Sequence, residues 1–244
     1  MAIPISCPMC NADNNYQFVV THHVYGDLEN RHAFYHCDKC DVRYLYPRLS
    51  PEQERKFYEM EFEKFMDRRA GPKGGWENVK SHYKANEPNR IRRMSYLNPY
   101  LKEHSRILEV GCSSGFMLKP LLDQGHECHG VDPSNKFRDY LDSVKIHNYS
   151  SMDELEAAKE SEGFDIIMHF FVLEHISNPL NFLEQQIKML KAGGKIVFEI
   201  PNVSDPLYAI YDIPEFERFY WSIAHPWYFS VKSLDYLLKK ERLK

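Results

Sequence analysis

The stretch ILEVGCSSGF, residues 107–116, decides which fold this sequence adopts. Its first four residues, with Arg106 before them, predict a buried parallel strand, since apolar side chains dominate the run. Gly111 and Gly115 then frame a tight turn, and residues 116–122 begin a helix. A strand, a glycine turn and a helix in this order open a Rossmann-type unit, whose turn lies against a nucleotide-like ligand.

Three classes of ligand use such turns, and the residues within the turn discriminate between them. A P-loop requires a lysine after its last glycine, but Phe116 stands there. A dinucleotide fold requires a glycine two positions after the first one, where this chain has Ser113. The remaining pattern, E-x-G-x-x-x-G, places the carboxylate of Glu109 beside the ligand, which suits a cation better than a phosphate. S-adenosyl-L-methionine carries two cationic groups and no phosphate, so we expect it as the cofactor.

The segments that follow continue an alternation of strands and helices. Residues 128–132 predict a second strand that ends in Asp132, which is placed to accept the two hydroxyls of a ribose. This acid fits a nicotinamide cofactor equally well. Further strands are expected near residues 145–149, 163–168 and 195–200. The predicted fold class is therefore α/β, with a Rossmann-like doubly wound sheet.

Four segments in order, LEVGCSSG, GVDPS, FDIIMHFFVLEHISNP and LKAGGKIVFEIPN, resemble the class I S-adenosylmethionine-dependent methyltransferases. The resemblance implies a cofactor site, a transferase activity and two further strands after residues 233–240. Because the sequence ends at Lys244, we expect either that the polypeptide is a fragment or that the sheet ends without those last strands. The resemblance assigns to the cofactor Glu109, Gly111, Cys112 and Gly115 at the methionine half, Asp132 at the ribose, Met152 and Asp153 at the adenine, and His169, Phe170 and Phe171 over the methionine end.

Two C-x-x-C pairs near the N-terminus, Cys7 with Cys10 and Cys37 with Cys40, predict a tetrahedral site for structural Zn²⁺. Strand-like segments and a Gly26-Asp27 turn lie between the pairs, which is the pattern of a zinc ribbon. So small a module needs the metal for its stability. A disulfide or redox pair is the alternative. The nearby histidines that could replace one thiolate are His22, His23, His32 and His36.

The cysteine-rich segment also resembles the zinc-binding front of a methyltransferase subgroup that includes sugar-nucleotide C-methyltransferases. Within that subgroup, AHPWYFSVKSLDYLL, residues 224–238, resembles an H-x-x-Y-F-S segment after the fifth strand. The resemblance implies that His225 faces the substrate as a base, with Tyr228 nearby. His175, beside Glu174, is the second candidate base. For each histidine a purely structural role is the alternative.

The chain divides by sequence into three predicted domains: a zinc-ribbon module at 1–48, a helical linker or lid at 49–104, and a Rossmann-like domain at 105–244. Ser50 and Gln53 predict a capping box for a helix that ends near residue 65. A glycine-rich loop at 71–75 follows, as a linker or a mobile lid. A second helix is expected at 89–101, with Ile91, Met94, Leu97 and Leu101 facing the core.

The composition narrows the possible partners and locations. The net charge of −4 disfavours a nucleic-acid binder, whose surface is usually basic. No apolar run approaches the roughly 18 residues of a membrane span, and the N-terminus lacks the order of a signal peptide. We therefore expect a cytoplasmic protein without a membrane partner, in which a homo-oligomer could cover the sheet edge.

The expected function is methyl transfer from S-adenosylmethionine to a small-molecule acceptor, such as a sugar nucleotide or a precursor of a polysaccharide or secondary metabolite. Two alternatives remain open. The first is an RNA methyltransferase that uses the zinc ribbon as its reader, and the second is a binding protein that keeps the cofactor fold without catalysis.

Overall fold

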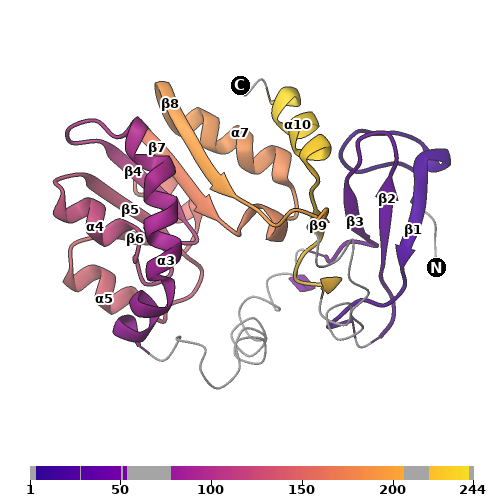
Figure 1. Ribbon diagram of the computed structural model, residues 1–244, viewed down its shortest axis with the longest axis horizontal. Helices are drawn as coiled ribbons and strands as arrows, with labels where there is room; N and C mark the ends of the chain where they lie inside the picture. Colours follow the sequence, from indigo (N-terminus) through magenta and orange to yellow (C-terminus); the bar gives the residue numbers. More distant parts are fainter. Residues whose placement is uncertain (1–3, 28, 51, 54–77, 206–219, 242–244) are drawn as a thin grey trace. The chain divides into compact units, whose positions relative to one another are not determined.

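The computed structural model describes residues 4–27, 29–50, 52–53, 78–205 and 220–241, and these form two compact units (Figure 1). The ribbon unit comprises Met1–Leu49, Phe171–Glu184 and Glu199–Lys244. The Rossmann unit comprises Ser50–Phe170 and Gln185–Phe198. Each unit is assembled from separate stretches of sequence. The compact units are not contiguous segments, so they do not test the predicted division into domains at 1–48, 49–104 and 105–244, which stays a prediction.

The ribbon unit contains a four-stranded sheet of order β1-β2-β3-β9, whose three neighbouring pairs are antiparallel. Its regular elements are η1 (Asn14–Tyr16), β1 (Gln17–Thr21), β2 (Ala33–Cys37), β3 (Arg43–Tyr46), η5 (Leu173–His175), β9 (Trp227–Tyr228) and α10 (Val231–Lys240). Aromatic side chains pair across the strands, with Tyr35 opposite Tyr44 and Tyr44 opposite Trp227. Such cross-strand pairs stabilise a sheet. The predicted ribbon strands are thus present, and β3 has a second partner, β9, from the far end of the chain.

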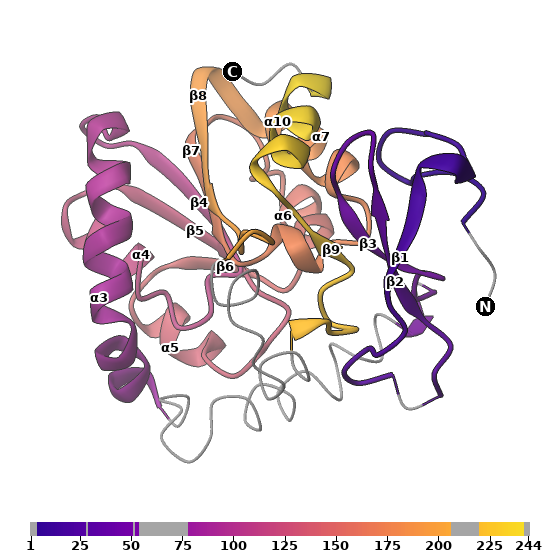
Figure 2. The ribbon, with the colours of Figure 1, turned by 45° about the vertical axis from the view of Figure 1, so that its right-hand side comes forward.

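The Rossmann unit contains a five-stranded sheet of order β6-β5-β4-β7-β8, in which β4 pairs in parallel with β5 and β7, and β5 with β6. Its strands are β4 (Arg106–Val110), β5 (Glu127–Val131), β6 (His147–Tyr149), β7 (Phe164–Phe170) and β8 (Leu190–Glu199). The helices are α3 (Val79–Leu97), η4 (Asn98–Tyr100), α4 (Leu118–Asp123), α5 (Arg138–Ser143) and α6 (Met152–Ala157), and α7 (Pro179–Met189) belongs to both units. This order confirms the predicted doubly wound sheet, with α3 and α4 on one side of the strands and α6 on the other (Figure 2).

Helix α3 differs from its prediction at both ends and in its inner face. It begins at Val79 because Asn78 and Ser81 form a capping box, and it ends at Leu97 before η4. Leu97 is fully buried as expected, and Met94 packs against the core, as Leu101 does beyond the helix. Ile91 is 60% exposed, so its assignment to the core was wrong. Buried His82 and Arg93 occupy the inner face instead.

The capping box predicted for the joining segment is confirmed. The Gln53 backbone N–H donates to Ser50 Oγ at 3.2 Å, and the Ser50 N–H donates to Gln53 Oε1 at 2.8 Å. The rest of that helix and the loop at 71–75 lie outside the described residues. Within the part of the chain that the structure describes, no helix combines the length and the apolar character that crossing a bilayer requires.

Candidate active site and metal centre

The carboxylate of Glu109 lies at the carboxyl end of β4 and is 2% exposed. Its Oε2 atom has no hydrogen-bond partner among the described residues. Burial raises the pKa of Glu109 well above 4.5, and the nearby Arg93 guanidinium acts in the opposite direction. Since buried polar atoms are nearly always paired, an orphan oxygen at a strand end indicates a place for a ligand.

The turn after β4 is tied to the next strand through Asp132. Its Oδ2 accepts the Ser113 backbone N–H at 2.8 Å, and its Oδ1 accepts the Ser134 N–H at 2.9 Å. Burial raises the pKa of Asp132, whereas these two N–H donors lower it. A carboxylate oxygen can accept two hydrogen bonds, so Asp132 retains capacity for ligand hydroxyls.

The glycines of the turn have positive φ angles, 76° at Gly111 and 72° at Gly115. A Cβ on Gly115 would lie 2.7 Å from Leu141 Cδ2, so a side chain there would collide with α5. The Cys112 side chain is fully buried and packs against Gly130 of β5. The sulfur of Cys112 therefore belongs to the core. If Cys112 contacts the cofactor as predicted, it does so through its peptide backbone.

The other residues assigned to the cofactor lie at the ends of β6 and β7. Met152 and the exposed Asp153 open α6, directly after β6. His169 is fully buried and stacks on Phe198 with centroids 5.0 Å apart, and burial lowers its pKa to about 3. The Phe170 ring lies under the Arg93 guanidinium at 4.2 Å. Because the strand order is β6-β5-β4-β7-β8, it reverses between β4 and β7, so the end of β7 borders the point where such sheets bind ligands, whereas β6 lies at the edge of the sheet.

His82 of α3, which no sequence pattern predicted as a site residue, supports the glycine turn. Its Nδ1 lies 2.7 Å from Ser114 Oγ, and its ring stacks on Phe137 at 5.5 Å. The neighbouring Tyr83 hydroxyl donates to the Gly115 carbonyl at 3.2 Å. Burial lowers the pKa of His82 to about 4, so the ring is neutral at neutral pH. No motif marks such a residue, because its role depends on how α3 packs.

Replacing His82 by alanine is expected to loosen the turn. Loss of the hydrogen bond to buried Ser114 should lower the free energy of unfolding by about 1–3 kcal/mol and weaken cofactor binding about tenfold. Thermal melts and cofactor titrations of His82→Ala measure both effects. His82→Asn should restore part of the affinity, since its amide reaches the Nδ1 position. Equal affinity in wild type and His82→Ala would contradict a supporting role.

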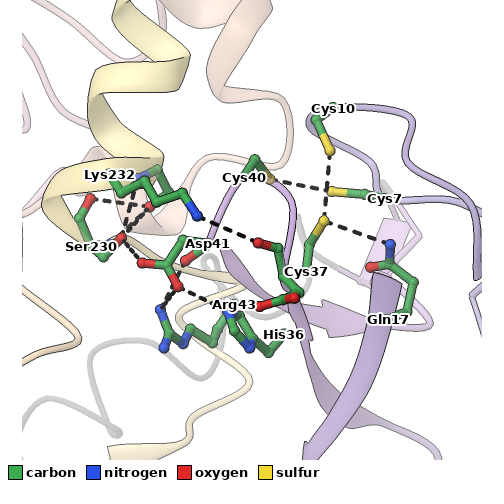
Figure 3. Close-up of polar contacts among 12 residues, drawn as sticks. Cys7, Cys10, Gln17, His36, Cys37, Cys40, Asp41, Arg43, Ser230 and Lys232 are labelled. Carbon is green, nitrogen blue, oxygen red and sulfur yellow. Dashed lines mark hydrogen bonds and ion pairs between the residues drawn. The ribbon is translucent and has the colours of Figure 1, made fainter. Parts of the chain in front are cut away.

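The four cysteines of the ribbon unit meet at one point (Figure 3). Cys7 Sγ and Cys40 Sγ lie 3.7 Å apart, and Cys10 Sγ and Cys37 Sγ lie 3.6 Å apart. Four sulfurs at 2.3 Å from one zinc ion would be separated by about 3.8 Å in a tetrahedron. The distances therefore fit a closed four-thiolate site.

Backbone and side-chain donors surround these sulfurs. The Met9 N–H points to Cys7 Sγ at 3.4 Å, and Gln17 Nε2 points to Cys37 Sγ at 3.6 Å. A hydrogen bond from Cys40 lowers the pKa of Cys7 to about 5, whereas burial raises the pKa of Cys10 to about 11. Two of the histidines that could replace a thiolate have other contacts: His36 Nε2 lies 2.9 Å from Asp41 Oδ1, and His32 Nδ1 lies 2.7 Å from the Pro47 carbonyl.

The second cysteine knuckle is linked to the N-terminus of α10 (Figure 3). Ser230 Oγ donates to Asp41, whose carboxylate also contacts His36 and Arg43. The same Ser230 caps α10 through a box with Ser233. This cluster of polar side chains joins residues 189 positions apart in the sequence.

The three predicted catalytic residues all lie in the ribbon unit. The rings of His175 and His225 meet edge to face with centroids 4.5 Å apart. His175 Nδ1 lies 2.7 Å from the Ala224 carbonyl. The Tyr228 hydroxyl accepts the Ser222 N–H at 3.0 Å and donates to the Tyr220 carbonyl, so it holds the segment before β9 in place.

Comparison with known proteins agrees with this fold. The family model described as "Methyltransferase domain" matches residues 81–241, which is more than half of the chain. The chain therefore belongs to this methyltransferase family, and its sheet is that of the class I S-adenosylmethionine-dependent enzymes.

Two curated relatives are ubiquinone biosynthesis O-methyltransferases. The protein from Ruegeria sp. (strain TM1040) is 29% identical over 113 residues, covering 43% of this chain and 44% of the relative. The protein from Coxiella burnetii (strain RSA 493 / Nine Mile phase I) is 27% identical over 134 residues, covering 48% and 56%. The match thus spans about half the length of these relatives.

Two solved structures share the fold. A SAM-dependent methyltransferase from Archaeoglobus fulgidus aligns with a TM-score of 0.51 and 21% identity, over 74% of this chain and 73% of that one. The plantazolicin methyltransferase BpumL, solved in complex with SAH and a pentazolic desmethylPZN analogue, aligns with a TM-score of 0.51 and 16% identity, over 77% of this chain and 72% of that one. At these identities the likeness concerns the fold alone.

Proposed function

We propose that this chain binds S-adenosylmethionine in the Rossmann unit and transfers its methyl group to a small-molecule acceptor. The observation that carries the proposal is the buried Oε2 of Glu109, which has no partner among the described residues and lies at the carboxyl end of β4. A buried carboxylate favours a cationic ligand, since an unpaired buried charge is costly. When bound, the cofactor supplies an electrophilic methyl group on a sulfonium.

The other residues of the turn fit the same cofactor. Asp132 would hold the ribose, and the backbone of Gly111 to Gly115 would lie against the methionine half. A pyrophosphate fits less well, because Ser113 brings a side chain where a dinucleotide fold has glycine. The Ser113 Oγ is buried and has no partner among the described residues, and it would offer the ligand one more hydrogen bond.

We infer that the cysteine cluster holds a structural Zn²⁺ ion through Cys7, Cys10, Cys37 and Cys40. The sulfur separations support this assignment, and four thiolates leave no open position for chemistry. The contribution of the metal is therefore the stability of the ribbon unit.

For the acceptor, we propose that His225 or His175 takes up the proton that a hydroxyl or an acidic carbon releases. The Ala224 carbonyl accepts from His175 Nδ1, which leaves Nε2 as the basic nitrogen. The relatives named above act on oxygen, as their names state. The resemblance of the N-terminal segment to sugar-nucleotide C-methyltransferases supports a sugar nucleotide as the acceptor to test beside phenolic compounds.

A second candidate function, RNA methylation, is supported by a basic hollow in the ribbon unit. The hollow has a volume of about 480 Å³ and is lined by Lys39, Cys40, Lys232, Asp235, Tyr236, Lys239 and Lys240. Four lysines and one acid beside a cysteine knuckle would attract phosphates. Small-molecule transfer is preferred because the chain as a whole carries a net charge of −4. RNA affinity that falls steeply with salt would reverse the preference.

Calorimetric titration with S-adenosylmethionine, with NADH as the control ligand, tests the proposal. We expect micromolar binding of the first ligand alone. Burial raises the pKa of Glu109, and a ligand cation would lower it again. At pH values between the pKa of the bound state and that of the free state, binding should therefore release a proton. Affinity should then rise with pH within that window, and the heat should vary with the ionisation enthalpy of the buffer.

The outcomes separate the alternatives. Binding of neither ligand would overturn the assignment of the cofactor. Binding without methyl transfer to phenols, sugar nucleotides or RNA would favour a protein that keeps the cofactor fold without catalysis.

A further inference from the structure

Three metal-ligating side chains meet in the ribbon unit, apart from the cysteines. Glu174 and His175 lie on η5, and His225 lies two residues before β9. One donor atom from each lies within 4.8 Å of the donor atoms of the other two. We propose that this cluster, the His-Glu cluster, binds a divalent transition-metal ion of the zinc class. It would be a second metal site of the chain.

Burial distinguishes the His-Glu cluster from a chance surface grouping. Glu174 is 2% exposed and His225 is 9% exposed, while His175 is half-buried. A carboxylate removed from water is stabilised by a cation, and two imidazoles at the same point supply the softer ligands that zinc favours over calcium or magnesium. The half-buried ring of His175 leaves the cluster accessible to an ion from solvent.

The tautomer of His175 suits metal binding. The Ala224 carbonyl, 2.7 Å from Nδ1, can only accept a hydrogen bond, so Nδ1 carries the hydrogen and Nε2 carries the lone pair. Histidine ligands of metals usually donate their second ring N–H to a carbonyl or carboxylate in this way. The contact therefore fixes the orientation of the His175 ring and makes Nε2 the nitrogen that can ligate an ion.

The two segments that carry the ligands are also joined before any ion binds. The Trp227 Nε1–H donates to the Ile176 carbonyl at 2.9 Å, which ties β9 to the residue after η5. On the other side, the Tyr228 hydroxyl bonds to the backbone at Ser222 and Tyr220. Sites held by such supporting hydrogen bonds lose little conformational freedom on binding.

The donor set defines the class of ion. Two imidazoles and one carboxylate form the three-ligand set of catalytic zinc sites, which leaves a fourth position open to water or a substrate oxygen. Donors around a tetrahedral zinc lie roughly 3.3 Å apart. From separations of at most 4.8 Å, the side chains would need to close by no more than about 1.5 Å.

This inference goes beyond the proposed function, because the ion could bind whether or not the chain transfers methyl groups. Both proposals involve the same ring nitrogens of His175 and His225. A metal ion and a proton compete for the same lone pairs. If both hold, added Zn²⁺ should slow any methyl transfer that uses His175 or His225 as a base.

Cobalt titration of the full chain, with zinc already loaded on the cysteines, tests the second site. We expect about one further equivalent of Co²⁺, with visible ligand-field bands and no thiolate-to-cobalt charge transfer in the near ultraviolet. Glu174→Gln and His225→Asn should each lower the cobalt affinity at least about tenfold. Circular dichroism of both variants reports whether they fold.

The matched control is Glu127→Gln, at the other group of potential ligands, Glu127, His129 and Glu160. There Arg106 forms ion pairs with both carboxylates, so we expect no metal and an unchanged cobalt affinity. The proposal is overturned if no second equivalent binds, if the spectrum shows thiolate ligands, or if Glu127→Gln removes the ion. Should a variant at the His-Glu cluster fail to fold, the wild-type spectrum and the control together still decide.

Discussion

Removal of zinc is expected to unfold the ribbon unit. Structural zinc sites contribute about 10–16 kcal/mol in small modules, which is comparable to the whole stability of a domain. The sulfurs of the cysteine cluster are 3.6–3.7 Å apart in two pairs, so four thiolates at these distances repel one another unless a metal ion binds them or protons neutralise them. Cys37→Ser, or a strong chelator, should therefore abolish the sheet of β1, β2, β3 and β9.

The aromatic side chains of the ribbon unit provide the signal for this experiment. Trp227 packs against Tyr44 with centroids 6.3 Å apart, and Trp221 packs against Phe34 at 5.0 Å. Their near-ultraviolet circular dichroism should disappear with the metal and return when Zn²⁺ is added. Metal analysis should give one ion per chain at the cysteines, or two if the His-Glu cluster is also occupied.

Cys128→Ser is the matched control for Cys37→Ser. Cys128 is equally buried but belongs to the core of the Rossmann unit, far from the cysteine cluster in sequence. Its replacement should leave the zinc content unchanged and cost only a modest loss of stability. A chain that keeps its aromatic signal after complete loss of zinc would refute the structural role of the metal.

Loss of cofactor binding is the expected result of changing Asp132. A charged hydrogen bond contributes about 1.5–3 kcal/mol, so the loss of two ribose contacts should weaken S-adenosylmethionine binding at least about 100-fold. Asp132→Ala would also leave the Ser113 and Ser134 N–H groups without their acceptor. We therefore expect it to lower the melting temperature as well.

Asp132→Asn separates the two effects, since its amide oxygen still accepts one of these N–H groups. Its stability should stay near that of the wild type while its affinity falls. Asp139→Asn, at an exposed carboxylate in the first turn of α5, is the control and should bind normally. Unchanged affinity in Asp132→Asn would remove Asp132 from the cofactor site.

Local sequence signals predicted the strands and the cysteine cluster well. The strand before the glycine turn was placed at Arg106–Val110, where β4 lies, because an apolar run that ends at a glycine turn is a local pattern. Likewise, the two C-x-x-C pairs were predicted to meet, and their sulfurs do. In both cases a short motif carries the signal, even though the two cysteine pairs lie far apart in the sequence.

The errors come from contacts between distant residues that no sequence motif marks. The inner face of α3 carries the polar residues His82 and Arg93. Because the prediction relied on the spacing of apolar residues, it assigned the exposed Ile91 to the core instead. Strand β9 has only two residues and gains its identity from pairing with β3, almost two hundred positions earlier. A short segment of this kind has no periodicity of its own from which a strand could be predicted.

The pairing of β9 with β3 also bears on how the chain can be shortened. The region that matches the methyltransferase family, residues 81–241, contains β9 and α10 but not the strand and the Asp41 carboxylate that hold them. A truncated chain confined to the family match would leave the backbone groups of β9 unpaired, and an open strand edge promotes aggregation. We therefore expect that the segment defined by the family match does not fold on its own, because Met1–Leu49 and Glu199–Lys244 belong to the same compact unit, in which the N-terminal segment acts as an intramolecular scaffold for the C-terminal one.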